Sequence, residues 1–444
     1  MNPELLEKIR GLVGPEHFLT GVELSPYVLE GRTPDAAVFP GSIEEISAIL
    51  ALASEAEVPV TPWGGGTKMA IGSPPTRVGL VLGLKRLGRL IEHEPGDLTA
   101  TVQAGMSLGA FQAEVGRRGQ WLSLDPGFAE QATLGGILAT NASGPRRHLY
   151  GTARDLLIGV TVVAADGSVV RGGGKVVKNV AGYDLPKLYI GSFGTLGVIV
   201  EATFKLRPLP DVDRCFLARF GGLKECGLAL KELLTSDLIP SAVELLDSEA
   251  ARGAGLVAGT DGGGTLLVGF DGLEAQVGWQ CEEARRLFEA VGLVEHRVLD
   301  GAARDQAWRA ASELPRRVVA EAAAQMKLAV LPAHVTDVIE QAGGVAQRHS
   351  LGAAFVAHAG IGIARGVLTG GRDSARAVAD VLGEWREIAK AAGGSALVEW
   401  APLAVKEAAA VWDPPGPAFR IMQRIKAQLD PRGILNPGRF VGGI

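Results

Sequence analysis

The sequence predicts an α+β protein with two large domains, and three observations predict it. At 444 residues the chain is too long for one ordinary hydrophobic core. Up to about Pro210, helices and strands surround glycine-rich turns, whereas from Arg214 to about Pro402 strands alternate with long amphipathic helices. Such alternation indicates antiparallel sheets backed by helices.

The first part can be assigned in order. Ser42 and Glu45 have capping-box spacing at the start of a helix that feeds a strand over Val58–Pro62. LTATVQAG alternates as a strand, Ser107 begins a helix, and LLIGVTVVAADGSVVRGG is typical of two strands joined by a DG turn. VIVEATFKLRPLP is a last strand that ends in prolines, so we place a domain boundary near Pro210.

The second part repeats strands and helices. The expected strands are CFLARF, AVELLD, TLLVGF, QMKLAVLP, AAFVAHAG and SALVEW, and the expected helices are 223–234, 273–291, 333–342 and 374–392. AFRIMQRIKAQLDPRGILNPGRF is a helix that stops at Asp430 and is followed by proline turns. We therefore expect four segments, which are 1–34, 35–210, 211–404 and 405–444, the last packing back on the 35–210 domain.

The composition excludes several classes of protein. Hydrophobic residues make up 47% of the chain, charged residues 21%, and the net charge of -5 offers no broad attraction to nucleic acid or to an anionic membrane. MNPELLEKIR is not typical of a signal peptide, and the apolar run LLIGVTVVAA is too short to span a bilayer. Cys215, Cys226 and Cys281 lack CxxC spacing, so an iron-sulfur cluster would need another subunit. We expect a cytoplasmic protein without a transmembrane segment, associated with the inner membrane at most through a complex.

Three glycine-rich stretches are candidates for a cofactor site. In PWGGGTK, glycines follow a strand and leave backbone N–H groups free to bind a pyrophosphate. Between Asp125 and Leu157, small residues follow an apolar helix, and Thr133, Asn141 and Ser143 can hydrogen-bond a flat ligand. GSFGTLGVI leads into a strand whose edge amides could contact an adenine or flavin ring. The glycine run of PWGGGTK taken alone is also explained by chance in a chain with 61 glycines, and the second stretch is also typical of a tight crossing of helix and strand.

Several polar side chains accompany these stretches. Arg146 and Arg147 are either solvated charges or partners of a phosphate or substrate carboxylate. Tyr183 and Lys178 are more commonly a half-buried tyrosine at a helix start and a surface lysine.

Together, the three stretches resemble the FAD-binding domain of the vanillyl-alcohol oxidase (PCMH-type) flavoproteins. The resemblance is carried by PWGGGT, LDPGFAEQATLGGILATNASGPRR and GSFGTLGVIVEATFKLRP. The cap and the terminal LDPRGILNPGRF are similar to the FAD-linked oxidase C-terminal domain of D-lactate and glycolate dehydrogenases. Within that group, GTARDLLIGVTVV and VVKNVAGYDLPKL resemble the FAD-binding E subunit of bacterial glycolate oxidase.

The resemblance implies an α+β fold with a two-subdomain PCMH-type FAD-binding domain and an FAD-linked oxidase cap. It also implies FAD as cofactor, which we expect to be non-covalent because PWGGGTK has no histidine or cysteine. The cofactor-binding residues that it implies lie in the three stretches, and they are Pro62, Trp63, Gly64, Gly65, Gly66, Thr67, Lys68, Pro126, Gly127, Thr133, Gly135, Gly136, Asn141, Ser143, Gly144, Tyr150, Gly151, Gly197, Val198 and Ile199.

The cap departs from the pattern of catalytic relatives. Relatives that oxidise D-2-hydroxy acids hold a metal with HxGDGNxH and a later EH pair. Here HAGIGIAR keeps His358, but Arg365 stands at the second histidine, and Glu399 is followed by Trp400. Because a stable divalent site needs three or four ligands, we predict no metal and interpret His358 as an ordinary strand residue. The candidates for catalysis are therefore weak, and they are His358, Glu399, Arg147 and Tyr183.

Three functions remain open. The first is an FAD-carrying accessory subunit of a glycolate or D-lactate type dehydrogenase, which relays electrons with a homologous catalytic flavoprotein and an iron-sulfur subunit while the complex oxidises a small 2-hydroxy acid. The second is a self-sufficient FAD oxidoreductase, and the third is a non-redox assembly scaffold.

Overall fold

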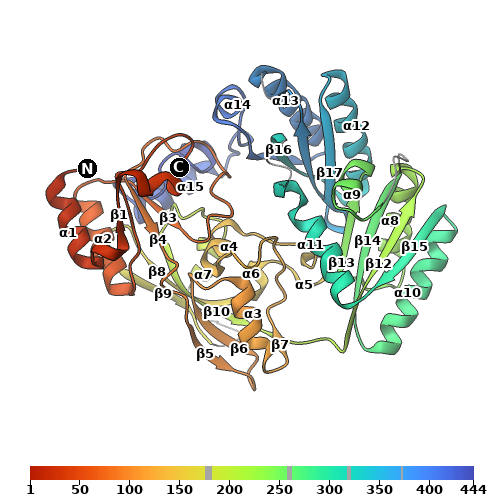
Figure 1. Cartoon of the computed structure of the whole chain (residues 1–444), viewed down its shortest axis with the longest axis horizontal. Coiled ribbons are helices and arrows are strands. Elements are labelled where there is room, and N and C mark those ends of the chain that lie inside the picture. The colour runs from red at the N-terminus through yellow and green to blue at the C-terminus, as the bar shows by residue number, and fades with distance from the viewer. Residues whose placement is uncertain (176–182, 258–262, 318–321, 372–373) are drawn as a thin grey trace. The chain divides into compact units, whose positions relative to one another are not determined.

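A computed structural model describes residues 1–175, 183–257, 263–317, 322–371 and 374–444 (Figure 1). The chain divides into two compact units. Unit 1 contains Met1–Ser143, Thr152–Leu209 and Pro414–Ile444, and unit 2 contains Gly144–Gly151 and Pro210–Asp413. The chain therefore passes from unit 1 into unit 2 twice.

The first sheet of unit 1 has the strand order β1-β2-β4-β3, in which β4 is parallel to β2 and β3. Its strands are β1 (Phe18–Leu19), β2 (Ala36–Val38), β3 (Val60–Trp63) and β4 (Leu80–Gly83), and helices α1 (Pro3–Val13) and α2 (Ile43–Glu55) belong to the same unit. The Ser42 hydroxyl accepts a hydrogen bond from the Glu45 N–H at 3.1 Å, which confirms the predicted start of α2. The buried face of α2 then carries Ile46, Ile49, Leu50 and Ala53.

The second sheet of unit 1 is antiparallel, with the order β5-β6-β10-β8-β9. Its strands are β5 (Leu90–Glu94), β6 (Thr99–Gln103), β8 (Leu157–Val163), β9 (Val169–Gly173) and β10 (Val198–Lys205). β10 pairs with β8 from Val198 onward but with β6 only from Glu201 onward, so the edge amides expected at Val198 and Ile199 stay a prediction, although the rest of β10 lies inside the sheet. The sequence could not reveal this, since strand order depends on pairing between distant segments.

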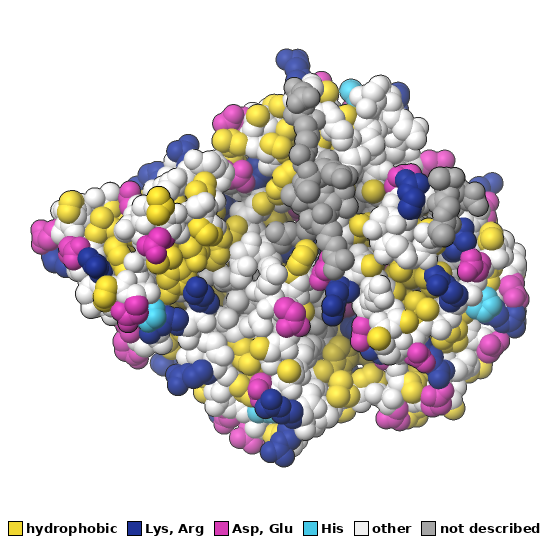
Figure 2. Space-filling view, in the orientation of Figure 1, with side chains coloured by type: hydrophobic (Ala, Val, Ile, Leu, Met, Phe, Trp, Pro, Cys, Tyr) yellow, Lys and Arg dark blue, Asp and Glu magenta, His cyan; other side chains and the backbone are white. Residues whose placement is uncertain are grey.

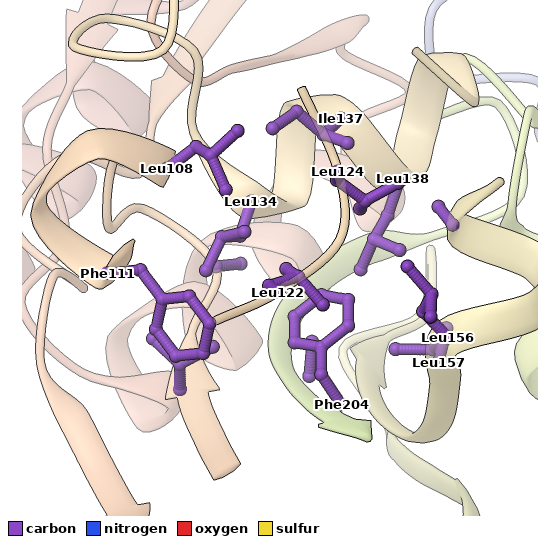
Figure 3. Packing of buried hydrophobic residues seen from close by; sticks show 14 of the residues in the cluster. Leu108, Phe111, Leu122, Leu124, Leu134, Ile137, Leu138, Leu156, Leu157 and Phe204 are labelled. Carbon is purple, nitrogen blue, oxygen red and sulfur yellow. The ribbon is translucent and has the colours of Figure 1, made fainter. Parts of the chain in front are cut away.

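Short elements surround this sheet. They are α3 (Leu108–Gly116), β7 (Gln120–Trp121), α4 (Leu134–Thr140), α6 (Ala153–Leu156), α7 (Leu185–Tyr189) and β11 (Arg207–Pro208). Figure 3 shows the apolar side chains of α3, α4 and β10 packed together, among them Phe111, Leu134 and Phe204. The ring centroids of Phe111 and Phe204 are 6.1 Å apart. This packing fixes α4 against the sheet.

The C-terminal segment completes unit 1. After α15 (Phe419–Leu429), the chain runs beside β3, where the Val60 N–H donates to the Ile434 carbonyl at 2.7 Å and the Asn436 N–H donates to the Val60 carbonyl at 3.0 Å. The buried Asp430 carboxylate accepts the N–H groups of Ile434 and Leu435. The last part of the chain is thereby fixed next to the PWGGGTK turn.

Unit 2 is built on one antiparallel sheet with the order β15-β12-β14-β13-β17-β18-β16-β19. Its strands are β12 (Val212–Phe220), β13 (Ala242–Leu246), β14 (Gly264–Gly272), β15 (Leu293–Leu299), β16 (Ala322–Ala329), β17 (Gly352–His358), β18 (Ile363–Thr369) and β19 (Ser395–Trp400). Its helices are α5 (Arg147–Tyr150), α8 (Leu223–Thr235), α9 (Ser248–Gly253), α10 (Glu274–Glu289), α11 (Gly301–Arg317), α12 (Val335–Arg348), α13 (Ala375–Ala391) and α14 (Leu403–Ala408). The predicted α+β class with antiparallel sheets backed by helices is confirmed.

Six elements of unit 2 were missed, and helix α12 was predicted too short. The sequence prediction contained none of β15, β18, α5, α9, α11 and α14. Glycines at 362 and 366 interrupt the alternation that would have revealed β18. Helix α12 continues to Arg348 through Gly343 and Gly344. The two glycines lower the helix propensity, but the buried face of the helix still stabilises it.

Replacing Phe204 by alanine tests the core of unit 1. Phe204 is fully buried, so Phe204→Ala should lower the free energy of unfolding by roughly 3–5 kcal/mol through the cavity that it leaves. Leu209, which is 49% exposed, provides the control, and Leu209→Ala should cost less than about 1 kcal/mol. Urea denaturation followed by circular dichroism measures both, and equal losses would contradict this description of the core.

Candidate functional site

Unit 1 contains a cavity, open to solvent, at the meeting point of four segments. The first segment is the turn after β3, the second the loop before α4 with α4 itself, the third the turn before β10, and the fourth the C-terminal segment. The residues that line it are Pro62, Gly64, Gly65, Gly66, Thr67, Lys68, Met69, Pro126, Gly127, Ala132, Thr133, Gly136, Ile137, Ala139, Thr140, Ala142, Phe193, Gly194, Asn436 and Arg439.

The glycine triplet is required by the close approach of two chain segments. A Cβ atom on Gly65 would overlap the carbonyl oxygen of Gln131, and one on Gly64 would overlap the Thr133 hydroxyl. Gly66 has a φ of 73°, a backbone conformation that favours glycine. Only glycines can therefore bring this turn against the loop before α4 and leave its backbone lining the cavity.

The loop before α4 is fixed by hydrogen bonds. The Thr133 hydroxyl caps α4 by accepting the Gly136 N–H at 3.3 Å, and the Leu134 N–H donates to the Met106 carbonyl at 2.9 Å. Thr133 and Gly136 both line the cavity. The start of α4 is therefore held at the cavity wall.

The sequence prediction missed the C-terminal wall of the cavity. Asn436 has a φ of 44° and donates its side-chain N–H to the Phe193 carbonyl at 2.6 Å. Its Oδ1 is buried and accepts no hydrogen bond from the described residues. Arg439 is buried as well, and it donates to the carbonyls of Met69 and Ile71 at 2.6 and 2.7 Å. The NPGRF stretch is the available signal, but the sequence predicts only proline turns and packing against the 35–210 domain there, and no cofactor contact.

Some of the predicted cofactor residues of unit 1 lie outside this cavity lining. Trp63 packs against Tyr27 with ring centroids 5.2 Å apart, and Asn141 ends α4 in a left-handed conformation with a φ of 48°. The remaining residues of this kind are Gly135, Ser143, Gly197, Val198 and Ile199. Val198 and Ile199 are buried where β10 pairs with β8.

The other predicted cofactor residues, Gly144, Tyr150 and Gly151, belong to unit 2. The Tyr150 hydroxyl donates to the Asp271 carboxylate at 2.6 Å. Arg146 pairs with Asp213 and also with Asp271, the latter at 3.0 Å. These contacts anchor the segment to β12 and β14, and they give Arg146 a structural ion-pair role instead of that of a solvated charge.

Unit 2 holds a second candidate site, a cluster of polar side chains on its sheet. Neighbouring strands β13, β17, β18 and β16 place Glu244 opposite His358 and Lys327 opposite Arg365. Side chains directly opposite in a sheet lie on the same face. Glu399 joins them from β19, where the pairing with β16 is irregular.

His358 is the centre of this cluster. Its Nδ1 lies 2.5 Å from Oε1 of Glu244, whose side chain is fully buried, and its Nε2 lies 2.8 Å from Nη1 of Arg365. His358 is the last residue of β17, and its ring connects a buried carboxylate to a guanidinium. No sequence pattern could have paired His358 with Glu244, which is distant along the chain.

Glu399 holds the other end of the cluster. Its Oε2 accepts from Nε of Arg365 at 3.1 Å and from Nε2 of Gln325 at 2.7 Å. Burial lowers the pKa of the nearby Lys327; the charge of Glu399 raises this pKa, and the charges of Arg365 and Arg147 lower it further. Of the weak catalytic candidates, the structure thus brings His358, Glu399 and Arg147 into one electrostatic neighbourhood.

The remaining polar candidates were Tyr183 and Lys178. The Tyr183 side chain is 91% exposed rather than half buried as expected, and Lys178 lies outside the described residues.

The glycines around His358 have packing roles. A Cβ on Gly360 would contact the ring of His148, and one on Gly366 would contact Trp385 and Phe355. Gly362 has a φ of 76° at the turn between β17 and β18. The alternating glycines of HAGIGIARG therefore fit a tight hairpin and its neighbours.

Among the residues that the structure describes, no group of three or more His, Cys, Asp or Glu side chains could hold a metal ion. Within the same residues, none of the helices is long and apolar enough to cross a membrane. On the face drawn in Figure 2, basic and acidic side chains are interspersed instead of gathered by sign.

Comparisons with known proteins identify both parts of the chain. Residues 34–173 match the family described as FAD binding domain, and residues 209–440 match the family described as FAD linked oxidases, C-terminal domain. Glycolate oxidase subunit GlcD of Bacillus subtilis is 31% identical over 92% of this chain and 89% of its own length. D-lactate dehydrogenase of Archaeoglobus fulgidus is 29% identical over 98% of each chain.

Solved structures share the fold. The structure of p-cresol methylhydroxylase with substrate bound has a TM-score of 0.78 at 19% identity, over 98% of this chain and 96% of that chain. Alkyldihydroxyacetonephosphate synthase has a TM-score of 0.75 at 19% identity, over 98% and 85%. These likenesses confirm the PCMH-type fold that the sequence predicted.

A pH-dependent stability is expected from Asp247, which holds β17 in place. Burial raises the pKa of Asp247 to about 6, although its carboxylate accepts the N–H groups of Ala250 and Phe355. The folded state therefore keeps a proton that the unfolded state loses above its ordinary pKa of 3.8. Relative to Asp247→Asn, the wild-type free energy of unfolding should fall by up to roughly 3 kcal/mol between pH 4 and 7.

Urea unfolding across that pH range measures this difference. The exposed Asp337→Asn is the matched control, and its profile should follow that of the wild type. If Asp247→Asn also followed the wild-type profile, the buried carboxyl would not be the source of the pH dependence.

Proposed function

The chain belongs to the FAD-linked oxidases, and we propose that it is the FAD-carrying subunit of a glycolate oxidase or D-2-hydroxy-acid dehydrogenase complex. The protein is an FAD-dependent oxidoreductase. In the proposed complex, it exchanges electrons with a homologous catalytic flavoprotein and an iron-sulfur subunit. The names glycolate oxidase subunit and D-lactate dehydrogenase among its relatives support a small 2-hydroxy acid as the substrate of the complex.

The cavity of unit 1 is the proposed FAD site, and two observations support the fit. The backbone of its glycine turn borders the space that a pyrophosphate would fill. The buried Oδ1 of Asn436 has no donor among the described residues and could accept a hydrogen bond from the cofactor. Thr67, Lys68 and Thr133 would bind polar groups of the cofactor there. When bound, FAD would take up the two electrons that a hydroxy acid loses on oxidation.

The residues around the cavity also support non-covalent binding. Within the described part of the chain, its lining contains neither histidine, cysteine nor tyrosine that could form a bond to the flavin. We therefore propose that the flavin is released when the protein is denatured.

The contact between Arg365 and His358 is the observation that favours an accessory subunit over a self-sufficient enzyme. A general base needs a free lone pair to take the proton of a substrate hydroxyl. Because a guanidinium can only donate, the Nε2 lone pair of His358 is engaged by Arg365 at 2.8 Å. This imidazole is thus poorly suited to deprotonate a hydroxy acid, which supports electron relay over substrate oxidation in this chain.

A second candidate function is favoured by Lys327. This largely buried cation lies near Arg365 and Arg147, with Glu399 as the carboxylate that opposes their charges. A substrate carboxylate would compensate this positive charge. A self-sufficient FAD-dependent D-2-hydroxy-acid oxidoreductase is therefore the alternative to the relay.

The glycine turn gives a direct test of the FAD site. In Gly65→Ala the new Cβ would force the turn away from the Gln131 carbonyl, so the affinity for FAD should fall at least about tenfold. Gly96 in the same unit has no atom within 4 Å of such a Cβ, so Gly96→Ala should bind FAD like the wild type. Titration of the apoprotein with FAD, followed by flavin fluorescence, compares the two. Equal affinities would argue against this cavity.

The function itself is tested by co-purification and by flavin reduction. The chain isolated with its native partners should contain one flavin of its own, and the complex should contain a second flavin and iron. The isolated FAD-loaded chain should stay oxidised under anaerobic glycolate or D-lactate and become reduced once the catalytic flavoprotein is added. Rapid bleaching of the isolated chain would favour the self-sufficient enzyme, and a chain that binds its partners but never FAD would favour a scaffold.

A further inference from the structure

The relatives that oxidise D-2-hydroxy acids imply a divalent metal in the cap, and the residues present do not fit one. His358 and Glu399 are the ligands that remain of the expected set. Both contact the same guanidinium, because Nε2 of His358 and Oε2 of Glu399 lie 2.8 and 3.1 Å from two nitrogens of Arg365. Arg365 therefore already engages both of the atoms that would have to bind a metal.

We propose that Arg365 is a built-in cation of unit 2, which replaces a divalent metal and excludes it. The guanidinium is permanently charged and offers its N–H groups in a plane, so one side chain can satisfy an imidazole and a carboxylate together. Its side chain is only 17% exposed, and that of Glu399 only 7%. A metal could enter only by displacing this partly buried ion pair, which would leave a charge uncompensated. The inference uses contacts within unit 2 and is independent of the proposed substrate and partners.

The arrangement also determines which ring nitrogen of His358 carries the proton. Nε2 faces a group that can only donate, so Nε2 must accept and has no hydrogen. The proton of the neutral ring is then on Nδ1, where it is donated to Oε1 of Glu244 at 2.5 Å. Arg365 is therefore a positioning residue that acts through His358, and Glu244 fixes the ring from the other side.

The strand register places residue 365 where its side chain can contact both His358 and Glu399, so we expect this one position to determine whether a metal can bind there. Arg365 lies opposite Val356 on β17, two residues before His358, and opposite Lys327 on β16. A shorter histidine at 365 would face the same side of the sheet and would add an imidazole to His358 and Glu399. Three protein ligands are enough for a zinc site with one open position.

The test measures the metal content of variants in the FAD-loaded full-length chain. After incubation with zinc and dialysis, Arg365→His should retain roughly one zinc per chain, whereas the wild type and Arg365→Lys should retain less than about a tenth of that. Arg219 is a matched control, because it forms a comparable cross-strand pair with Glu295 at 2.8 Å without a histidine. Arg219→His should therefore retain no more zinc than the wild type.

Two results would overturn the proposal. One is a wild-type chain that holds stoichiometric zinc and loses it in His358→Ala. The other is an Arg365→His chain that folds, as judged by circular dichroism and FAD content, and binds no more zinc than Arg219→His.

A second measurement decides the matter if Arg365→His does not fold. In wild-type protein with ¹⁵N-labelled histidine, the His358 signals, assigned by their loss in His358→Gln, should show a protonated Nδ1 and an unprotonated Nε2 at neutral pH. Arg365→Lys, which keeps a donor, should preserve this pattern, and Arg365→Ala should lose it and regain it with added guanidinium ion. A protonated Nε2 in the wild type would contradict the proposal.

Discussion

The register of the antiparallel sheet in unit 2 is the constraint on which the second candidate site depends. Five adjacent strands contribute one or two polar side chains each, and these meet because the pairings place Glu244 opposite His358 and Lys327 opposite Arg365. A slip of one residue in any of these pairings would turn a charged side chain to the other face of the sheet. Buried charges that lose their partners are costly, so the cluster and the register stabilise each other.

Much of the fold could be predicted from local signals in the sequence. The capping residue Ser42 and the apolar spacing after it located α2, and the glycines of PWGGGTK located a turn where two segments touch. These signals work because a helix cap and a close backbone contact restrict the residue types at single positions. The same locality explains what could not be predicted. The position of β10 inside its sheet and the length of α12 depend on packing by distant segments.

In the candidate sites, too, residues in local sequence patterns could be predicted, and residues placed by distant contacts could not. The residues that line the unit 1 cavity from PWGGGTK and from the loop before α4 were predicted, because each stretch has a recognisable pattern. Asn436 and Arg439 were missed, since their place depends on the return of the chain to β3. The partners of His358 could not be predicted for the same reason. Its partners Glu244 and Arg365 reach it through strand pairing, so the loss of a metal motif concealed a different set of contacts.

The contribution of the C-terminal segment to the unit 1 cavity has a consequence for biosynthesis. The cavity combines the turn at residues 62–69 with Asn436 and Arg439, so its walls are complete only after the ribosome has translated the chain as far as residue 439. The rest of unit 1 could begin to fold during translation, but a pocket with this shape could not yet retain a cofactor. With FAD in this cavity, as proposed, cofactor loading would follow the synthesis of the C-terminal segment, and nascent chains that stall within unit 2 would remain empty.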